Sequence, residues 1–264
     1  MSTDLLVEKN NGILKLIMNR PERRNALSDA MLNKMLEELN KASFDNSIRV
    51  IVLTGTGNAF CAGGDLKDMA EKEETGGKTT QQRTNDLRRV METSRLLHEI
   101  TTPTIAVIPG PAAGAGFSLA LACDMRIACE SSKLTTAFAK VGFPGDFGGS
   151  YFLTQMIGTA KARELYYLAE LMTAEQAGEI GIINKVIPDS KFEEESNKIV
   201  AQIASGPSIA YRYMKTNMNI AELGDLNQSL DNEAIHQTLC RFTEDHRNAT
   251  KAFIEKKKPV FTGK

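Results

Sequence analysis

One carboxylate stands in a setting where it could do chemistry. Asp146 lies in the segment KVGFPGDFGGSYF, residues 140–152, between a Pro-Gly pair and a Gly-Gly pair. Glycine allows backbone shapes and close approaches that other residues do not, so this loop could hold a side chain against a ligand. Asp is also a preferred helix cap, and a helix is expected to begin near Gly148. The loop alone leaves both interpretations of Asp146 open.

Two further segments could supply backbone hydrogen-bond donors. They are FCAGGDL, residues 60–66, and AAGAGFS, residues 112–118. In each, a strand-like run opens through small residues into a helical turn, where the first N–H groups have no partner inside the helix. Two such N–H groups directed at one oxygen would stabilise an enolate or a tetrahedral oxyanion. Small residues also serve ordinary packing, so neither segment decides the matter alone.

Other kinds of site find little support. The second segment departs from the dinucleotide pattern GxGxxG because Leu119 stands at the third glycine, and the chain has no GxxxxGK[ST] motif. Its four cysteines form no CxxC pair, and its three histidines are widely separated. We therefore expect no metal site and no Cys-His or Ser-His nucleophile.

Composition restricts the partners and the location. The chain has 264 residues, of which 42% are hydrophobic, and a formal net charge of -1 from 32 basic and 33 acidic residues. This balance predicts neither a nucleic-acid nor a membrane partner. No apolar run approaches the about 20 residues that span a bilayer, and neither end of the chain has a secretory or SKL-type peroxisomal signal. A cytoplasmic location is expected.

The elements that must position these segments follow a layered α/β pattern. Residues 5–19 predict a hairpin that turns at Asn-Asn-Gly, Ser28 is a candidate N-cap for the next helix, and IRVIVLTG predicts a buried strand. Strand and helix signals alternate again after Pro103. The polar residues 71–86 are expected to form a mobile excursion that could act as a lid. From about Ser190 the pattern is amphipathic and helical.

Four segments in this order resemble the crotonase superfamily, the enoyl-CoA hydratases and isomerases. They are NRPERRNALS, AFCAGGDLKDM, GPAAGAGFSLALACDMRIA and LMTAEQAGEIGIINKVIP. The resemblance implies an α/β fold, a crotonase-like spiral of β-β-α turns with a helical C-terminal region. It implies a core at residues 1–190 that binds acyl-CoA, and a region at 191–264 for trimerisation and site closure. The expected assembly is a homotrimer or a dimer of trimers. No separate cofactor is implied, since coenzyme A is part of the substrate.

The resemblance also assigns roles to individual residues. Gly64 and Ala115 would donate their N–H groups to the thioester oxygen, although relatives usually have Gly at the second position. Residues at positions that bind coenzyme A are Arg24, Ala26, Ala62 and Lys256, the last often reaching the nucleotide of an adjacent subunit. For the two cations, a solvated surface charge is the alternative interpretation.

The two glutamates of a typical hydratase correspond here to Ser118 and Ala137, so the standard hydratase mechanism has no support. Asp146 corresponds to the catalytic glutamate of peroxisomal-type enoyl-CoA isomerases and to the nucleophilic aspartate of 4-chlorobenzoyl-CoA dehalogenase. Partial burial among Phe143 and Phe147 would raise its pKa. The leading hypothesis is double-bond isomerisation, in which Asp146 moves a proton from C2 to C4 of an enolate intermediate.

Several alternatives stay open. An isomerisation in aromatic degradation, as in the epoxyphenylacetyl-CoA isomerases, would use the same parts. In a dehalogenase, Phe138 and Met91 would replace the expected tryptophan and histidine, and His98 is interpreted as structural. A pattern similar to that of DHNA-CoA synthase makes Ser150 a possible polar site residue. A non-catalytic acyl-CoA-binding subunit is the alternative outside enzymes.

Overall fold

Two sheets organise the chain, and the computed structural model describes residues 3–74 and 76–264. The central sheet has six strands in the order β1-β2-β3-β4-β6-β9, and a three-stranded sheet has the order β5-β7-β8. Neighbouring strands are parallel except in the pairs β1 with β2 and β7 with β8. The strands are β1 Leu5–Asn10, β2 Ile13–Met18, β3 Val50–Gly55, β4 Thr104–Ile108, β5 Ala112–Ala113, β6 Met125–Cys129, β7 Lys133–Thr135, β8 Met172–Thr173 and β9 Lys185–Ile187.

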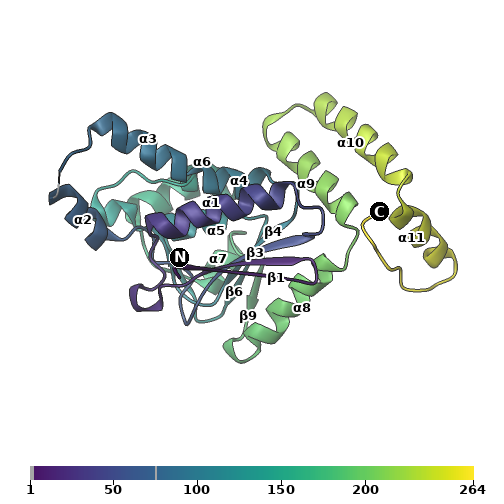
Figure 1. The fold of residues 1–264 in the computed structure, drawn as a ribbon, viewed down its shortest axis with the longest axis horizontal. Coiled ribbons are helices and arrows are strands. Elements are labelled where there is room, and N and C mark those ends of the chain that lie inside the picture. Colours follow the sequence, from purple (N-terminus) through teal and green to yellow (C-terminus); the bar gives the residue numbers. More distant parts are fainter. Residues whose placement is uncertain (1–2, 75) are drawn as a thin grey trace.

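Helices cover both faces of the central sheet (Figure 1). Helices α1 and α4 lie over one face, and α8 packs on the opposite face, where Val200 and Ala204 join a second apolar cluster with Val50 and Val52. The helices are α1 Asp29–Ser43, α2 Leu66–Glu74, α3 Thr80–Val90, α4 Glu92–Glu99, α5 Gly114–Leu121, α6 Gly149–Leu168, α7 Ala174–Glu179, α8 Phe192–Ala204, α9 Ser208–Leu223, α10 Leu226–Arg241 and α11 Glu244–Ile254. Short 3-10 turns are η1 Pro21–Arg23, η2 Phe138–Val141 and η3 Asp189–Lys191.

The predicted opening of the fold is confirmed. Strands β1 and β2 pair antiparallel through a turn in which Asn11 and Gly12 have φ of 50° and 77°. The Ser28 hydroxyl accepts the N–H of Met31 at 3.1 Å and so caps α1. Strand β3 then pairs parallel to β2. The hairpin and the cap are local signals, which is why the sequence alone could predict them.

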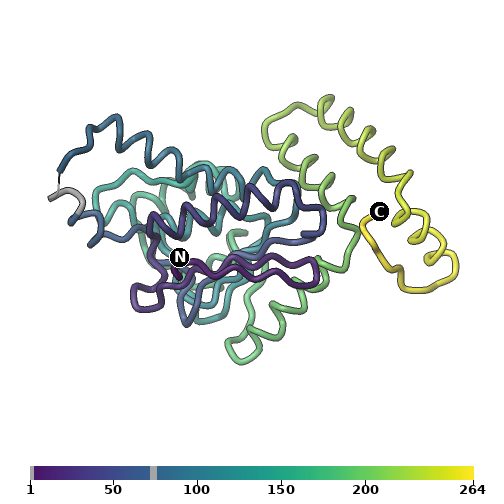
Figure 2. The backbone as a smooth tube through the Cα atoms, viewed as in Figure 1, coloured from purple at the N-terminus to yellow at the C-terminus, as the bar shows by residue number. Residues whose placement is uncertain are grey.

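Residues 71–86 differ from the predicted irregular excursion. The structure places residues 71–74 in α2 and residues 80–86 in α3, and residue 75 lies outside the described residues. Figure 2 shows α3 as a coil at the end of the molecule opposite the C-terminus. Helix α3 begins with a reciprocal capping box, in which Thr79 and Gln82 each accept the other's backbone N–H. These caps and the packing of α3 on α1 and α4 support a helix that is short of apolar residues.

The C-terminal region is helical from Phe192 on, as predicted. Helix α9 is tied to the core by Lys215, whose ammonium lies 2.9 Å from the Asp124 carboxylate and donates to the Leu97 carbonyl, also at 2.9 Å. Helices α10 and α11 extend away from the sheets (Figure 1). Within the described ranges, no helix combines the length and the apolarity needed to cross a bilayer. Large apolar side chains exposed on this region include Leu223, Leu226, Leu230, Ile235, Phe242, Phe253 and Ile254.

Candidate active site

The two segments predicted to supply backbone donors lie side by side. Cys61 and Ala112 form an isolated parallel bridge, and the Ala113 N–H donates to the Cys61 carbonyl at 2.9 Å. A methyl group added at Gly63 would stand 3.4 Å from the Ala115 nitrogen and 2.8 Å from the Ala113 carbonyl oxygen. Only glycine permits this approach, and its φ of 93° also favours glycine.

The N–H groups of Gly64 and Ala115 are both available to a ligand. Ala115 is the second residue of α5, where the helix supplies no acceptor for its N–H group. Within residues 3–74 and 76–264, neither N–H group donates to a protein acceptor. Gly64 is half-buried and Ala115 is buried. The arrangement can stabilise negative charge on one oxygen, helped by the positive end of the α5 dipole.

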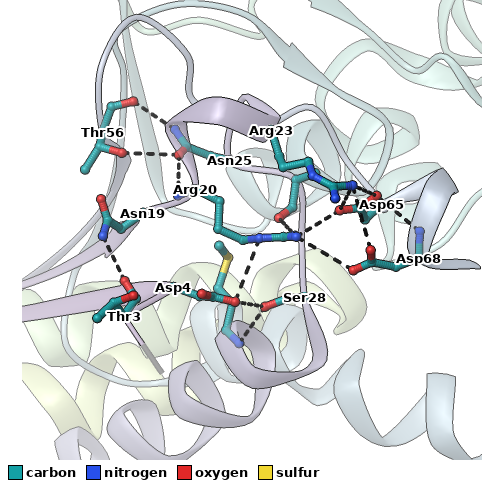
Figure 3. Close-up of polar contacts among 12 residues, drawn as sticks. Thr3, Asp4, Asn19, Arg20, Arg23, Asn25, Ser28, Thr56, Asp65 and Asp68 are labelled. Atoms are coloured by element: carbon teal, nitrogen blue, oxygen red, sulfur yellow. Dashed lines mark hydrogen bonds and ion pairs between the residues drawn. The ribbon is translucent and has the colours of Figure 1, made fainter. Parts of the chain in front are cut away.

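An ionic cluster holds the chain directly after Gly64 (Figure 3). Asp65 is only 6% exposed, and its carboxylate lies 3.0 Å from Arg20 and 3.2 Å from Arg23. Burial alone would raise the pKa of Asp65, but the Asp68 N–H and the Arg20 guanidinium outweigh it and hold the pKa below the usual value. Sequence reasoning missed this cluster, although opposite charges inside two of the recognised segments were a signal for it.

Arg24, Ala26 and Ala62 come together on adjoining segments. The Ala62 N–H donates to the Arg24 carbonyl at 3.0 Å, and Arg24 has a left-handed backbone with φ of 49°. The buried Asn25 amide supports this turn by donating to the carbonyls of Thr56 and Ala59, both at 2.9 Å. Arg24 and Ala62 are exposed, whereas Ala26 is buried.

Lys256 lies apart from these residues within one chain. It is exposed and follows α11, which Figure 1 places at the opposite end of the molecule from α2 and α3. In a single chain the structure therefore does not bring Lys256 to the other predicted coenzyme A positions.

Asp146 does not cap a helix, so that interpretation was wrong. Helix α6 has Gly148 as its N-cap, with no side-chain hydrogen bond to the cap. The Asp146 Oδ1 atom is buried and has no hydrogen-bond partner among the described residues. Burial raises the pKa of Asp146 from 3.8 to about 6. Of its expected apolar neighbours in sequence, Phe147 is buried but Phe143 is 52% exposed.

The Asp146 loop approaches α5, the helix that carries the second donor, since a methyl group added at Gly149 would stand 2.4 Å from Ser118 Oγ. Burial raises the pKa of the Cys61 thiol to about 12, and the charge of Asp146 adds to this effect. Cys61 in turn lies against α5, because a methyl group added at Gly116 would stand 2.7 Å from its sulfur. Tertiary folding thus packs Cys61, an unreactive buried thiol of the first donor segment, against the helix that carries the second donor.

The positions of the two hydratase glutamates hold no acid. Ser118 is buried in α5 and donates to the Gly114 carbonyl at 3.3 Å, and Ala137 precedes η2. His98 lies 3.3 Å from the Glu222 carboxylate, and its ring centroid lies 5.3 Å from that of Phe152. These contacts of His98 link α4, α6 and α9, in agreement with a structural role.

The residues singled out for the synthase-like and dehalogenase alternatives have no contacts that indicate catalysis. Ser150 is exposed in the first turn of α6, and Phe138 stacks on Tyr166. Among the described residues no group of side chains has the composition of a metal site. A cavity of about 820 Å³ lies between α9, α10 and α11, but none of the predicted site residues lines it. Asp146 and the two donor segments therefore remain the candidate site.

A layered α/β core, paired backbone donors and a helical C-terminal region define an enzyme class, the crotonase superfamily. The model of the enoyl-CoA hydratase/isomerase family matches residues 8–264, so the chain belongs to that family. It is 36% identical over 263 residues to a 1,2-epoxyphenylacetyl-CoA isomerase of Escherichia coli, covering 98% of this chain and 97% of the relative. It is 35% identical over 263 residues to an enoyl-CoA isomerase/hydratase of Mycosarcoma maydis, covering 96% and 93%.

Solved structures agree with this fold. An enoyl-CoA hydratase from Bacillus anthracis has a TM-score of 0.91 at 31% identity, covering 99% of this chain and 100% of that one. One from Polaromonas sp. JS666 has a TM-score of 0.91 at 29% identity, covering 98% and 99%. The predicted fold class is thus confirmed, and membership of the family implies an acyl-CoA substrate.

Proposed function

We propose that this enzyme moves a double bond along the acyl group of an acyl-CoA thioester, with Asp146 as its single acid and base. The observation that carries the proposal is a buried, unpartnered Asp146 oxygen in a loop that packs on α5, together with the N–H groups of Gly64 and Ala115, which donate to no described protein acceptor. One acid suffices for such a reaction, since the proton that leaves one carbon returns at another.

The mechanism begins with the thioester oxygen between the N–H groups of Gly64 and Ala115. With a pKa of about 6, Asp146 is mostly ionised at pH 7 and accepts the proton from C2. The electron pair of the broken C–H bond moves onto the thioester oxygen as a dienolate, which the two donors stabilise. Asp146 then returns the proton at C4, and the double bond closes between C2 and C3.

The test uses a trans-3-enoyl-CoA in D2O. Wild-type protein should form the 2-enoyl thioester and incorporate deuterium, whereas Asp146→Asn should lose both and still bind the CoA ester. A matched control is Asp231→Asn, which removes a carboxylate from an exposed position on α10. Full conversion by Asp146→Asn would refute the proposed acid. Binding without conversion or exchange by the wild type would instead favour a binding subunit.

A second candidate function is isomerisation of an acyl-CoA derived from an aromatic compound. Its support is the 36% identity to the epoxyphenylacetyl-CoA isomerase of Escherichia coli, whose substrate would meet the same acid and donors. A dehalogenase has less support, since Phe138 and Met91 stand at its expected tryptophan and histidine. Release of chloride from 4-chlorobenzoyl-CoA would overturn that judgement.

We further propose that residues 191–264 assemble the chain into a homotrimer or a dimer of trimers in the cytoplasm, and that Lys256 reaches the coenzyme A of a neighbouring copy. Its support is the exposure of Phe242 at 73% and Phe253 at 84%. Light scattering should give a mass of three or six chains. The double variant Phe242→Ser/Phe253→Ser should shift that mass toward one chain, and a monomeric wild type would contradict the assembly.

A further inference from the structure

The phenol of Tyr166 fills the space behind the Asp146 loop. Tyr166 lies near the C-terminal end of α6, twenty positions after the acid it approaches. A methyl group added at Gly145 would stand 2.8 Å from Tyr166 Cε1, and one added at Gly149 would stand 2.6 Å from the Tyr166 hydroxyl. A side chain at Gly145 or at Gly149 would thus collide with Tyr166, so the position of this one ring requires glycine at both places.

The Ser118 hydroxyl approaches the same place from α5. A methyl group added at Gly149 would stand 2.4 Å from Ser118 Oγ, close to where it meets the Tyr166 hydroxyl. Ser118 belongs to the helix whose first turn supplies the Ala115 donor. Two hydroxyls, one from α5 and one from the far end of α6, therefore lie together at the Gly149 backbone, three positions after Asp146.

The Tyr166 hydroxyl is a donor without a partner. It makes no hydrogen bond with the residues that the structure describes, and its ring is held by stacking on Phe138, with centroids 5.9 Å apart and an interplanar angle of 15°. Burial and the charge of Asp146 both raise the pKa of Tyr166 above its usual value, which keeps the hydroxyl neutral and able to donate. A hydrocarbon acyl group placed here would exclude water from this hydroxyl without replacing its hydrogen bond, which costs free energy.

We infer that Tyr166 is a specificity-determining residue whose hydroxyl donates to an oxygen atom of the acyl group, with the Ser118 oxygen as an acceptor where that atom is a hydroxyl. The preferred ligand is thus a CoA ester whose acyl group carries a hydroxyl, carbonyl or ether oxygen. The inference rests on the proposed function in one respect, that the acyl group lies against Asp146. It goes beyond that function by selecting among acyl groups.

The experiment measures binding and not turnover, so it stands if the isomerase proposal fails. Isothermal titration compares phenylacetyl-CoA with its 2-, 3- and 4-hydroxylated analogues. Wild-type protein should bind at least one hydroxylated ester about tenfold or more tightly than phenylacetyl-CoA, since a site built to hydrogen-bond a ligand oxygen discriminates against its absence. Tyr166→Phe should abolish this preference and leave the affinity for phenylacetyl-CoA within about twofold.

Two further variants complete the test. Tyr167→Phe is the matched control, because Tyr167 is 75% exposed on the same helix, and it should keep the wild-type preference. Ser118→Ala should reduce the preference for the hydroxylated ester by about threefold. This variant still tests the inference if Tyr166→Phe does not fold. Equal affinities of the wild type for all four esters would overturn the inference. An equal loss for all four esters in a folded Tyr166→Phe protein would also overturn it.

Discussion

The Arg20 guanidinium lies 3.0 Å from the Asp65 carboxylate, and Asp65 directly follows Gly64, one of the two proposed donors. The side chains of Arg20 and Asp65 are 12% and 6% exposed. The ion pair thus lies mostly out of water and holds the backbone that presents the Gly64 N–H.

Asp65→Asn should therefore destabilise the fold, because it removes the nearest and most buried anion of the Arg20 guanidinium and leaves Asp4 and Asp68 at 3.8 and 3.7 Å. We expect a loss of about 2–4 kcal/mol in the free energy of unfolding in urea at pH 7. Asp68→Asn removes an outer carboxylate of the same cluster, 35% exposed, and should cost under about 1 kcal/mol. Equal effects of the two substitutions would contradict the role assigned to the buried pair.

The Asp65 effect should also depend on pH. The folded protein holds the pKa of Asp65 below its ordinary value of 3.8, so the stabilisation is complete above that value and is lost as pH falls through the folded pKa. The difference between wild type and Asp65→Asn should shrink accordingly in unfolding curves recorded below pH 4. A difference that does not change with pH would argue against an ionic origin.

Two adjacent glycines should respond differently to alanine. Gly63→Ala meets both a left-handed φ of 93° and the Ala113 carbonyl at 2.8 Å, so we expect a loss of about 2–4 kcal/mol in unfolding free energy. Gly64→Ala meets only the flexible end of Met69 at 2.6 Å and should lose under about 1 kcal/mol. Thermal unfolding of the two variants decides, and a larger loss for Gly64→Ala would contradict the geometry.

Removal of the Asp146 carboxylate should stabilise the protein at neutral pH. An acid whose pKa rises from 3.8 to about 6 on folding costs stability as pH increases through that window. Asp146→Asn cannot ionise and should exceed the wild type by about 2–3 kcal/mol at pH 8, with little difference at pH 4. Urea unfolding at the two pH values tests this, and a destabilised variant at pH 8 would contradict the desolvated carboxylate.

Lys215 should anchor the C-terminal helices to the core. Lys215→Met removes the ammonium that lies 2.9 Å from Asp124, while Asp124 keeps the Thr104 N–H at 2.7 Å. Because the Asp124 carboxylate still accepts the Thr104 N–H, we expect a loss of about 2–3 kcal/mol in the free energy of unfolding, at the low end for a broken buried ion pair. Limited trypsin digestion should also cleave the variant sooner within α9. Lys198→Met, at an exposed position on α8, should match the wild type in both measurements.

Much of the fold could be predicted because its signals are local. The Asn-Asn-Gly turn and the Ser28 cap each depend on a few consecutive residues, and the order of four segments resembled one superfamily. The helices within residues 71–86 were missed because polar composition outweighed the Thr79 capping box, while the predicted mobility of this segment stays a prediction. The interpretation of Asp146 as a helix cap was wrong because Gly148 is the N-cap residue of α6, and no side chain donates to or accepts from that cap.

The sequence by itself determined the fold class, the family and the residue types that could serve as acid and donors. Only the tertiary structure decided that Cys61 of the first donor segment packs against α5 of the second, that Gly149 after Asp146 packs against Ser118 of α5, and that Arg20 pairs with the buried Asp65. It also placed the Tyr166 hydroxyl beside Gly149, seventeen positions earlier in α6, because the non-helical backbone of Gly158 (φ 74°, ψ 164°) breaks that helix in two. Burial and hydrogen-bond satisfaction arise from packing between segments far apart in sequence, and no local pattern encodes them.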